Sequence, residues 1–140
     1  MQELTTFISN HPSLSIGVLI VFGLIAFVEL IRAKRNTVNI DPVRLTQLIN
    51  HQSAAVIDLR PQDAYRKGHI IDAQMLTPTE VRDSSKKLEK LKARPVVLVC
   101  NTGIESQKIA ANLLKQGYNA YSLSGGMRAW TEAQMPIIKE

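Results

Sequence analysis

The stretch PVVLVCNTGIESQKIA, residues 95–110, decides the fold of this 140-residue chain. It begins with a run of β-branched residues that is typical of a buried strand. Cys100 ends that run, a short loop containing Gly103 follows, and the pattern of an amphipathic helix begins near Ile104. A strand, a tight loop and a helix in this order predict an α/β arrangement with Cys100 at the carboxyl end of a strand.

The rest of residues 39–140 repeats this alternation. Besides residues 95–99, the patterns predict strands over 54–59, 73–76 and 120–123, and helices over 41–50, 61–67, 78–92, 104–116 and 127–134. Because the strands are apolar throughout and helices separate them, we expect a central parallel sheet with helices on both faces. In such sheets ligands bind at the carboxyl ends of the strands, where Cys100 stands.

An apolar segment precedes this domain. No residue from Pro12 to Val28 is charged, and about 20 apolar residues in a helix cross a bilayer core of about 30 Å. The segment is apolar on all sides, so as a buried core helix it would need a second element to cover its other faces. A cleaved signal peptide would have a basic start, whereas residues 1–11 contain no Lys or Arg. We therefore expect one transmembrane helix over residues 13–31, after a short extracytoplasmic N-terminus at 1–12.

Basic residues after the apolar segment predict its orientation. Arg32, Lys34 and Arg35 follow the segment directly, and no basic residue precedes it. The excess of positive charge on the cytoplasmic side places the N-terminus outside. A basic linker at 32–38 and a domain at 39–140 would then lie in the cytoplasm, a compartment that suits a chain with a single cysteine.

The net charge of +5 would by itself allow a nucleic acid or an anionic membrane as partner. Basic residues are densest over 82–94, where they alternate with acidic residues and lack interleaved aromatic residues. That pattern favours a solvated helix face and excludes a nucleic-acid partner. No spacing of His, Cys, Asp and Glu fits a metal site, and we expect no cofactor.

Cys100 is the candidate nucleophile. A lone cysteine is more often inert than reactive. Here the loop can direct several backbone N–H groups at one point, and the start of the following helix adds partial positive charge. Both effects favour the thiolate, which is the nucleophilic form. A phosphatase is excluded because its Cys-x5-Arg loop would need arginine where Ser106 stands.

Four ordered segments resemble the signatures of rhodanese-like single-domain sulfurtransferases. They are VIDLR (56–60), YRKGHI (65–70), CNTGIES (100–106) and LSGGMRAW (123–130). The resemblance covers residues 38–136. With the apolar segment included, the chain is similar to the membrane-tethered rhodanese-like proteins of Gram-negative bacteria. It implies the rhodanese-like fold, a central parallel sheet with helices on both faces, and a location in the bacterial inner membrane.

The resemblance also implies sulfur transfer. Cys100 would take the terminal sulfur of a donor such as thiosulfate or a persulfide, hold it as a cysteine persulfide, and pass it to a thiol or other thiophilic acceptor; donor and acceptor can be proteins. Gly103 permits the turn of the loop, and we expect Ser106 to cap the following helix with its hydroxyl. The loop that binds the substrate would consist of Asn101, Thr102, Gly103, Ile104, Glu105 and Ser106.

For the predicted sulfur transfer, we expect supporting roles for residues outside the loop. Asp58 and Arg60 match the D-x-R of the family, and we expect them to order the loops around the site from a second layer. Many relatives carry a carboxylate where Ala64 stands, and Asp63 is a candidate to replace it as a partner of Arg60. His69 is expected to be a packed structural residue.

Glu105 departs from the family pattern, since relatives that use thiosulfate commonly have arginine there. A carboxylate beside the sulfur disfavours both the thiolate and a dianionic donor, so thiosulfate is disfavoured as the physiological donor. Two functions stay open. Cys100 favours a membrane-anchored sulfurtransferase, whereas Glu105 leaves room for a non-catalytic rhodanese-fold module that recruits protein partners to the membrane.

Overall fold

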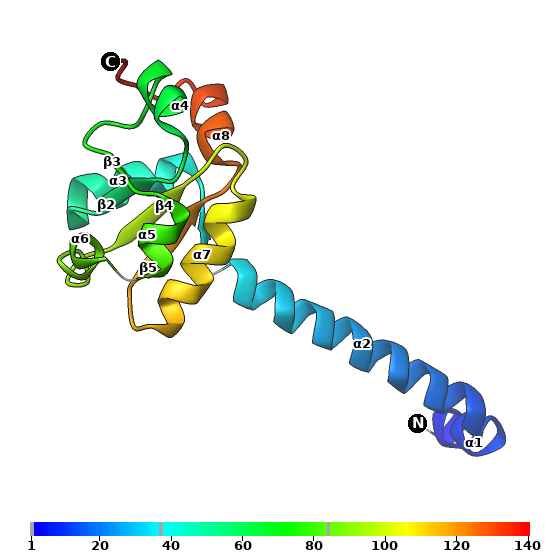
Figure 1. The fold of residues 1–140 in the computed structure, drawn as a ribbon. Helices are drawn as coiled ribbons and strands as arrows, with labels where there is room; N and C mark the ends of the chain where they lie inside the picture. Colours follow the sequence, from blue (N-terminus) through cyan, green and yellow to red (C-terminus); the bar gives the residue numbers. More distant parts are fainter. Residues whose placement is uncertain (1, 37, 84) are drawn as a thin grey trace. The chain divides into compact units, whose positions relative to one another are not determined.

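The computed structural model describes residues 2–36, 38–83 and 85–140. The chain divides into two compact units, Met1–Arg35 and Asn36–Glu140. Figure 1 shows helices alone in the first unit, and a sheet with its covering helices in the second.

The first unit consists of helix α1 (Gln2–Asn10) and the long helix α2 (Pro12–Asn36) except its last residue. The sequence patterns did not predict α1. Within α2 the 20 residues Pro12–Ile31 are long and apolar enough to cross a membrane, and none of that segment is buried inside the structure. This helix is therefore a candidate membrane span.

The second unit contains a sheet of five strands in the order β1-β5-β4-β2-β3. Every pair of neighbours is parallel; Ile57 pairs with Leu98, and Val97 pairs with Tyr121. The predicted parallel sheet is confirmed, and all five carboxyl ends lie at one edge. The strands are β1 (Asn39–Ile40), β2 (Ala55–Asp58), β3 (Gln74–Met75), β4 (Val96–Val99) and β5 (Ala120–Leu123).

Helices cover both faces of this sheet, as predicted. They are α3 (Pro42–Gln52), α4 (Gln62–Lys67), α5 (Pro78–Arg82), α6 (Lys86–Glu89), α7 (Ile104–Lys115) and α8 (Gly126–Glu132). Side chains of α5, α6 and α7 form one hydrophobic cluster with Ile57 and Leu98, while α3 and α8 form the other with Val56 and Val97. Successive residues of a strand point to opposite faces, so β2 and β4 contribute to both clusters.

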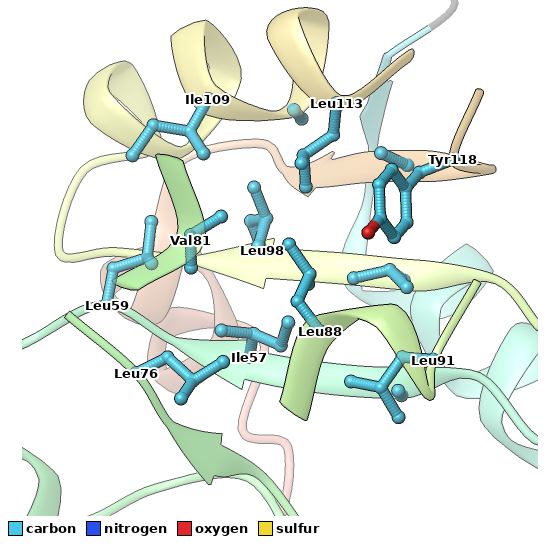
Figure 2. Packing of buried hydrophobic residues seen from close by; sticks show 14 of the residues in the cluster. Ile57, Leu59, Leu76, Val81, Leu88, Leu91, Leu98, Ile109, Leu113 and Tyr118 are labelled. Atoms are coloured by element: carbon cyan, nitrogen blue, oxygen red, sulfur yellow. The ribbon is translucent and has the colours of Figure 1, made fainter. Parts of the chain in front are cut away.

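Figure 2 shows the first of these clusters. Ile109 and Leu113 of α7 lie on the same side of the sheet as Leu88 of α6; Leu98 of β4 lies between them, and Ile57 of β2 lies beside Leu88. All five side chains are at most 3% exposed. Burying a side chain of this size contributes roughly 1.5–3 kcal/mol to the folded state, so this cluster holds α7 firmly on the sheet.

The single helix predicted over residues 78–92 is wrong; the structure has α5 and α6 there instead. A capping box formed by Thr77 and Glu80 begins α5, and Asp83 ends it. Ser85 is the N-cap of α6. Asp and Ser compete with the helix backbone for hydrogen bonds and favour caps, which explains why the helix breaks in this segment although its apolar residues keep helical spacing.

The sequence patterns also did not predict β1. Its two residues, Asn39 and Ile40, pair with Ser122 and Leu123 of β5 and extend the sheet by one strand. A strand this short has no periodicity that a pattern could show. The next element begins where predicted, because the side chain of Asp41 accepts a hydrogen bond from the N–H of Arg44 at the start of α3.

Candidate active site

Cys100 follows β4 directly and begins the loop that leads into α7. Its side chain is buried, and its Sγ accepts a hydrogen bond from the N–H of Gly103 at 3.0 Å. Gly103 has φ +88°, and a Cβ on it would lie 2.9 Å from the backbone nitrogen of Gly125. Both the backbone conformation and the space therefore require glycine, as predicted for the turn of the loop.

Ser106 does not cap α7, contrary to the prediction. The N-cap is Gly103, and no side chain caps this helix. Since α7 begins at Ile104, Ser106 already has helical geometry, whereas a capping residue lies outside the helix. Ser106 is fully buried instead, and its Oγ lies 3.3 Å from Cys100 Sγ.

A second buried serine completes a chain of hydrogen bonds behind the cysteine. Ser122 of β5 has its Oγ 2.8 Å from that of Ser106, and neither residue is exposed to solvent. The Ser106 hydroxyl also lies 3.2 Å from the carbonyl oxygen of Gly103, to which it can donate. The sequence signal for Ser122 is a polar residue at an inward-facing position of an apolar strand, where a hydroxyl needs a partner.

The surroundings of Cys100 lower the pKa of its thiol. Burial acts in the opposite direction, since it raises the pKa by disfavouring the charged thiolate. The hydroxyl of Ser106 and the backbone N–H groups of Ser106, Gly103 and Thr102 hydrogen-bond to the sulfur and outweigh that effect, so the pKa falls below its ordinary value. Cys100 is thus set up to react as a thiolate.

Asp58 and Arg60 form a buried ion pair at the end of β2. Arg60 Nη2 lies 2.7 Å from Asp58 Oδ2, and the two side chains are 8% and 1% exposed. Arg60 Nη2 also donates to the carbonyl oxygen of Gly68 at 2.7 Å. In the described part of the chain, the carboxylate that pairs with Arg60 is Asp58 and not Asp63, which is exposed on α4. The pair ties the end of β2 to the segment that follows α4.

His69 is packed against its neighbours, as predicted. Its ring stacks on that of Tyr65 with centroids 3.8 Å apart, and its Nδ1 lies 3.0 Å from the Tyr65 carbonyl oxygen. The backbone of His69 forms an antiparallel bridge with Ile138 near the end of the chain. This histidine therefore has a structural role away from the pocket in front of Cys100.

A pocket of about 390 Å³ opens in front of Cys100. The other loop residues that line it are Asn101, Thr102, Ile104 and Glu105, whereas Gly103 and Ser106 do not. The remaining lining residues are Leu59, Arg60, Pro61, Arg82 and Lys108. A pocket of this size accommodates a small molecule. Arg60 lines it together with the Cys100 loop, whereas the sequence predicted a place for Arg60 in a second layer; Asp58 does not line the pocket.

Arg82 and Lys108 were not among the predicted site residues. Arg82, in the last turn of α5, belongs to the basic stretch that the sequence assigns to a solvated face, and Lys108 lies on α7 one turn after Glu105. Their place at the pocket depends on how α5 and α7 pack side by side. Among the residues that the structure describes, no group of three His, Cys, Asp or Glu side chains could hold a metal ion.

Comparisons with known proteins agree with this geometry. A family model described as "Rhodanese-like domain" matches residues 41–133. The chain is 34% identical over 143 residues to "Uncharacterized protein YibN" of Escherichia coli strain K12, and the match covers 99% of both chains. It is 36% identical over 85 residues to "Thiosulfate sulfurtransferase GlpE" of Coxiella burnetii, which covers 60% of this chain and 78% of that protein.

Solved structures show the same fold. The rhodanese-related protein of Thermoplasma volcanium superposes with a TM-score of 0.64 at 23% identity, covering 73% of this chain and 98% of that one. The rhodanese homologue TT1651 of Thermus thermophilus gives a TM-score of 0.53 at 31% identity, covering 65% of this chain and 98% of that one.

Proposed function

This chain belongs to the rhodanese-like domain family, and we propose that it is a membrane-anchored sulfurtransferase that carries a transferable sulfur atom on Cys100. The observation that carries the proposal is the position of Cys100 Sγ. Cys100 lines a pocket, and its Sγ is hydrogen-bonded to the Gly103 N–H and to the hydroxyl of Ser106. Similarity to a thiosulfate sulfurtransferase supports the same chemistry.

In this proposal the Cys100 thiolate attacks the terminal sulfur of the donor. A new S–S bond forms on Cys100 while the donor's own bond to that sulfur breaks and its electron pair leaves with the departing group. That group is sulfite if the donor is thiosulfate and a thiolate if the donor is a persulfide. An acceptor thiolate then attacks the outer sulfur of the Cys100 persulfide, and Cys100 leaves as the thiolate again.

The loop residues have defined tasks in this cycle. The N–H of Gly103 and the hydroxyl of Ser106 stabilise negative charge on the sulfur before attack and after transfer, because hydrogen bonds to a charged acceptor are the stronger ones. Asn101, Thr102, Ile104 and Glu105 form the wall that the donor contacts. Arg60 lines the same pocket, and its ion pair with Asp58 and its hydrogen bond to the Gly68 carbonyl oxygen hold the neighbouring loop in place.

Mass spectrometry of the intact protein tests the proposal. The purified full chain is exposed to thiosulfate or to a small persulfide, and we expect the mass of one sulfur atom to be added to wild type but not to Cys100→Ser. If no donor forms an adduct on Cys100, the sulfur-carrier function is wrong. A rhodanese-fold module that recruits proteins to the membrane would then be the better account.

We further propose that the chain is anchored in the bacterial inner membrane by residues 13–31. Residues 1–12 would face outward, and the linker 32–38 and the domain 39–140 the cytoplasm. The apolar segment Pro12–Ile31 of α2 and the basic residues that follow it support this topology. A reporter fused after residue 36 should behave as cytoplasmic, and periplasmic behaviour would contradict the orientation.

A further inference from the structure

Charges of both signs line the pocket in front of Cys100, and the transfer step described above does not use all of them. Glu105 lies in the first turn of α7, Lys108 one turn later on the same helix, and Arg82 in the last turn of α5. All three residues are exposed. The fourth charged lining residue, Arg60, is neutralised by its buried ion pair with Asp58.

The exposed charges are available to a ligand. The ion pairs in the described part of the chain join Arg60 to Asp58, His69 to Glu140, and Arg128 to Glu132, so they include none of Glu105, Lys108 and Arg82. The pocket therefore presents one carboxylate and two cations that no side chain among the described residues neutralises within ion-pair distance.

We propose that this pocket selects a zwitterionic sulfur donor, namely the persulfide of an amino acid or short peptide. The donor's carboxylate binds Arg82 and Lys108, and its ammonium group faces Glu105. The exposed side chain of Ile104 and the buried Leu59, both lining residues, contact the carbon atoms that link these two groups to the sulfur. The inference rests on the proposed function, since it names the donor class for the same cysteine.

Charge complementarity explains why such a donor is preferred to thiosulfate. Thiosulfate brings two negative charges and no positive one, so Glu105 repels it while Arg82 and Lys108 attract it. The ammonium group of a zwitterionic donor is instead attracted by the Glu105 carboxylate. At an exposed site each such contact changes a rate or an affinity by roughly two- to fivefold.

The transfer from this donor balances without an oxidant or a reductant. The Cys100 thiolate attacks the outer sulfur of R–S–SH, the new Cys100–S–SH bond forms, and the S–S bond of the donor breaks. The electron pair of that bond leaves on R–S⁻, which takes up a proton from water. The outer sulfur and its hydrogen pass to Cys100 together, so the numbers of atoms and charges agree on both sides.

A set of donors that differ by one group tests the inference. Single-turnover formation of the Cys100 adduct in the full chain is measured with the persulfides of cysteine, of 3-mercaptopropionate, which lacks the amino group, and of cysteamine, which lacks the carboxylate. Thiosulfate serves as the dianionic donor. We expect cysteine persulfide to react fastest, by about two- to fivefold for each group that the others lack.

Variants separate recognition from the intrinsic reactivity of each donor. Glu105→Gln should abolish the preference for the amino group and accelerate the reaction with thiosulfate. Arg82→Gln and Lys108→Gln should each weaken the preference for the carboxylate. Lys115→Gln is the matched control, because Lys115 is exposed on the same helix and does not line the pocket.

The outcomes distinguish this inference from the function on which it rests. If every donor forms the adduct but the Glu105, Arg82 and Lys108 variants keep the wild-type ratios between donors, zwitterion selection is wrong and sulfur transfer stands. If cysteine persulfide has no advantage over the other two persulfides in wild type, selection is likewise wrong. If no donor places a sulfur on Cys100, the proposed function itself is wrong.

Discussion

The Oγ atoms of Ser106 and Ser122 lie 2.8 Å apart in a fully buried position behind the thiol of Cys100. Ser106 Oγ is also 3.3 Å from Cys100 Sγ, so α7, β5 and the loop share one chain of hydrogen bonds. Among the described residues, the side chain of Ser122 is hydrogen-bonded to that of Ser106. A buried hydroxyl keeps its hydrogen bonded, so Ser122 donates to Ser106 when Ser106 donates to the thiolate.

We therefore expect Ser122→Ala to raise the pKa of Cys100. Losing the hydrogen bond that orients Ser106 weakens the stabilisation of the thiolate and so raises this pKa. The pKa is measured from the pH dependence of alkylation by iodoacetamide. Ser106→Ala should raise it further, and adding Ser122→Ala to Ser106→Ala should change nothing more, since Ser122 acts through Ser106.

Ser124→Ala is the control for this pair, because Ser124 is exposed just after β5. The pKa of Cys100 in the Ser124→Ala variant should equal its pKa in wild type. Equal pKa values in Ser122→Ala and wild type would show that the Ser122 hydroxyl does not influence the thiolate. Fully additive effects of the two buried serines would show that they act separately.

The lowered pKa of Cys100 also predicts how stability depends on pH. Burial raises this pKa, but the hydrogen bonds from Ser106, Gly103 and Thr102 outweigh it, so the folded-state value lies below the unfolded value of about 8.5. Ionisation of Cys100 therefore stabilises the folded state. This contribution is fully present above the unfolded pKa of the thiol and is lost as the pH falls through its folded pKa.

Thermal unfolding of wild type and Cys100→Ala across this range measures the effect. The advantage of wild type should grow as the pH rises towards the unfolded pKa of about 8.5 and then level off, because above that pH the unfolded cysteine has also lost its proton. An advantage that shrinks over this range would contradict the lowered pKa.

The sequence predicts those parts of the site that follow one another along the chain. The strand, the turn at Gly103 and the helix after it each have a local pattern, so the place of Cys100 at a strand end is predicted correctly. The alternation of apolar strands and helices likewise predicts the parallel sheet with two covered faces. Local patterns suffice there because each element depends on its own residues.

Contacts between distant segments are what the sequence does not predict. Ser122 reaches Ser106 only because β5 lies beside β4 in the sheet, and Arg82 reaches the pocket only because α5 packs on the same face as α7. The role of Ser106 is mispredicted for a related reason. Its residue type suits a cap, but the start of α7 at Ile104 places its side chain in the core.

The buried ion pair predicts a large effect of Arg60→Gln on stability. Removing the guanidinium leaves the Asp58 carboxylate, 1% exposed, without its charged partner, which typically costs about 3–5 kcal/mol. Arg128→Gln is the matched control, since Arg128 and Glu132 are 78% and 67% exposed and such a pair contributes about 1 kcal/mol or less. Denaturant unfolding of both variants checks this. Equal destabilisation by the two changes would mean that the buried pair is not needed for folding.

Gly126 holds the start of α8 against the back of the Cys100 loop, and Gly126→Ala should therefore impair sulfur loading. The N–H of Met127 donates to the carbonyl oxygen of Cys100 at 2.9 Å. Gly126 has φ +58°, and a Cβ there would overlap that oxygen and the backbone of Asn101. Alanine at this φ costs at least about 1 kcal/mol, and relieving the overlap must move the loop that holds the sulfur. We expect a lower thermal midpoint than in wild type, and slower adduct formation than in wild type when both proteins are compared at a temperature where each is folded. Wild-type loading in folded Gly126→Ala would show that the loop tolerates displacement by α8.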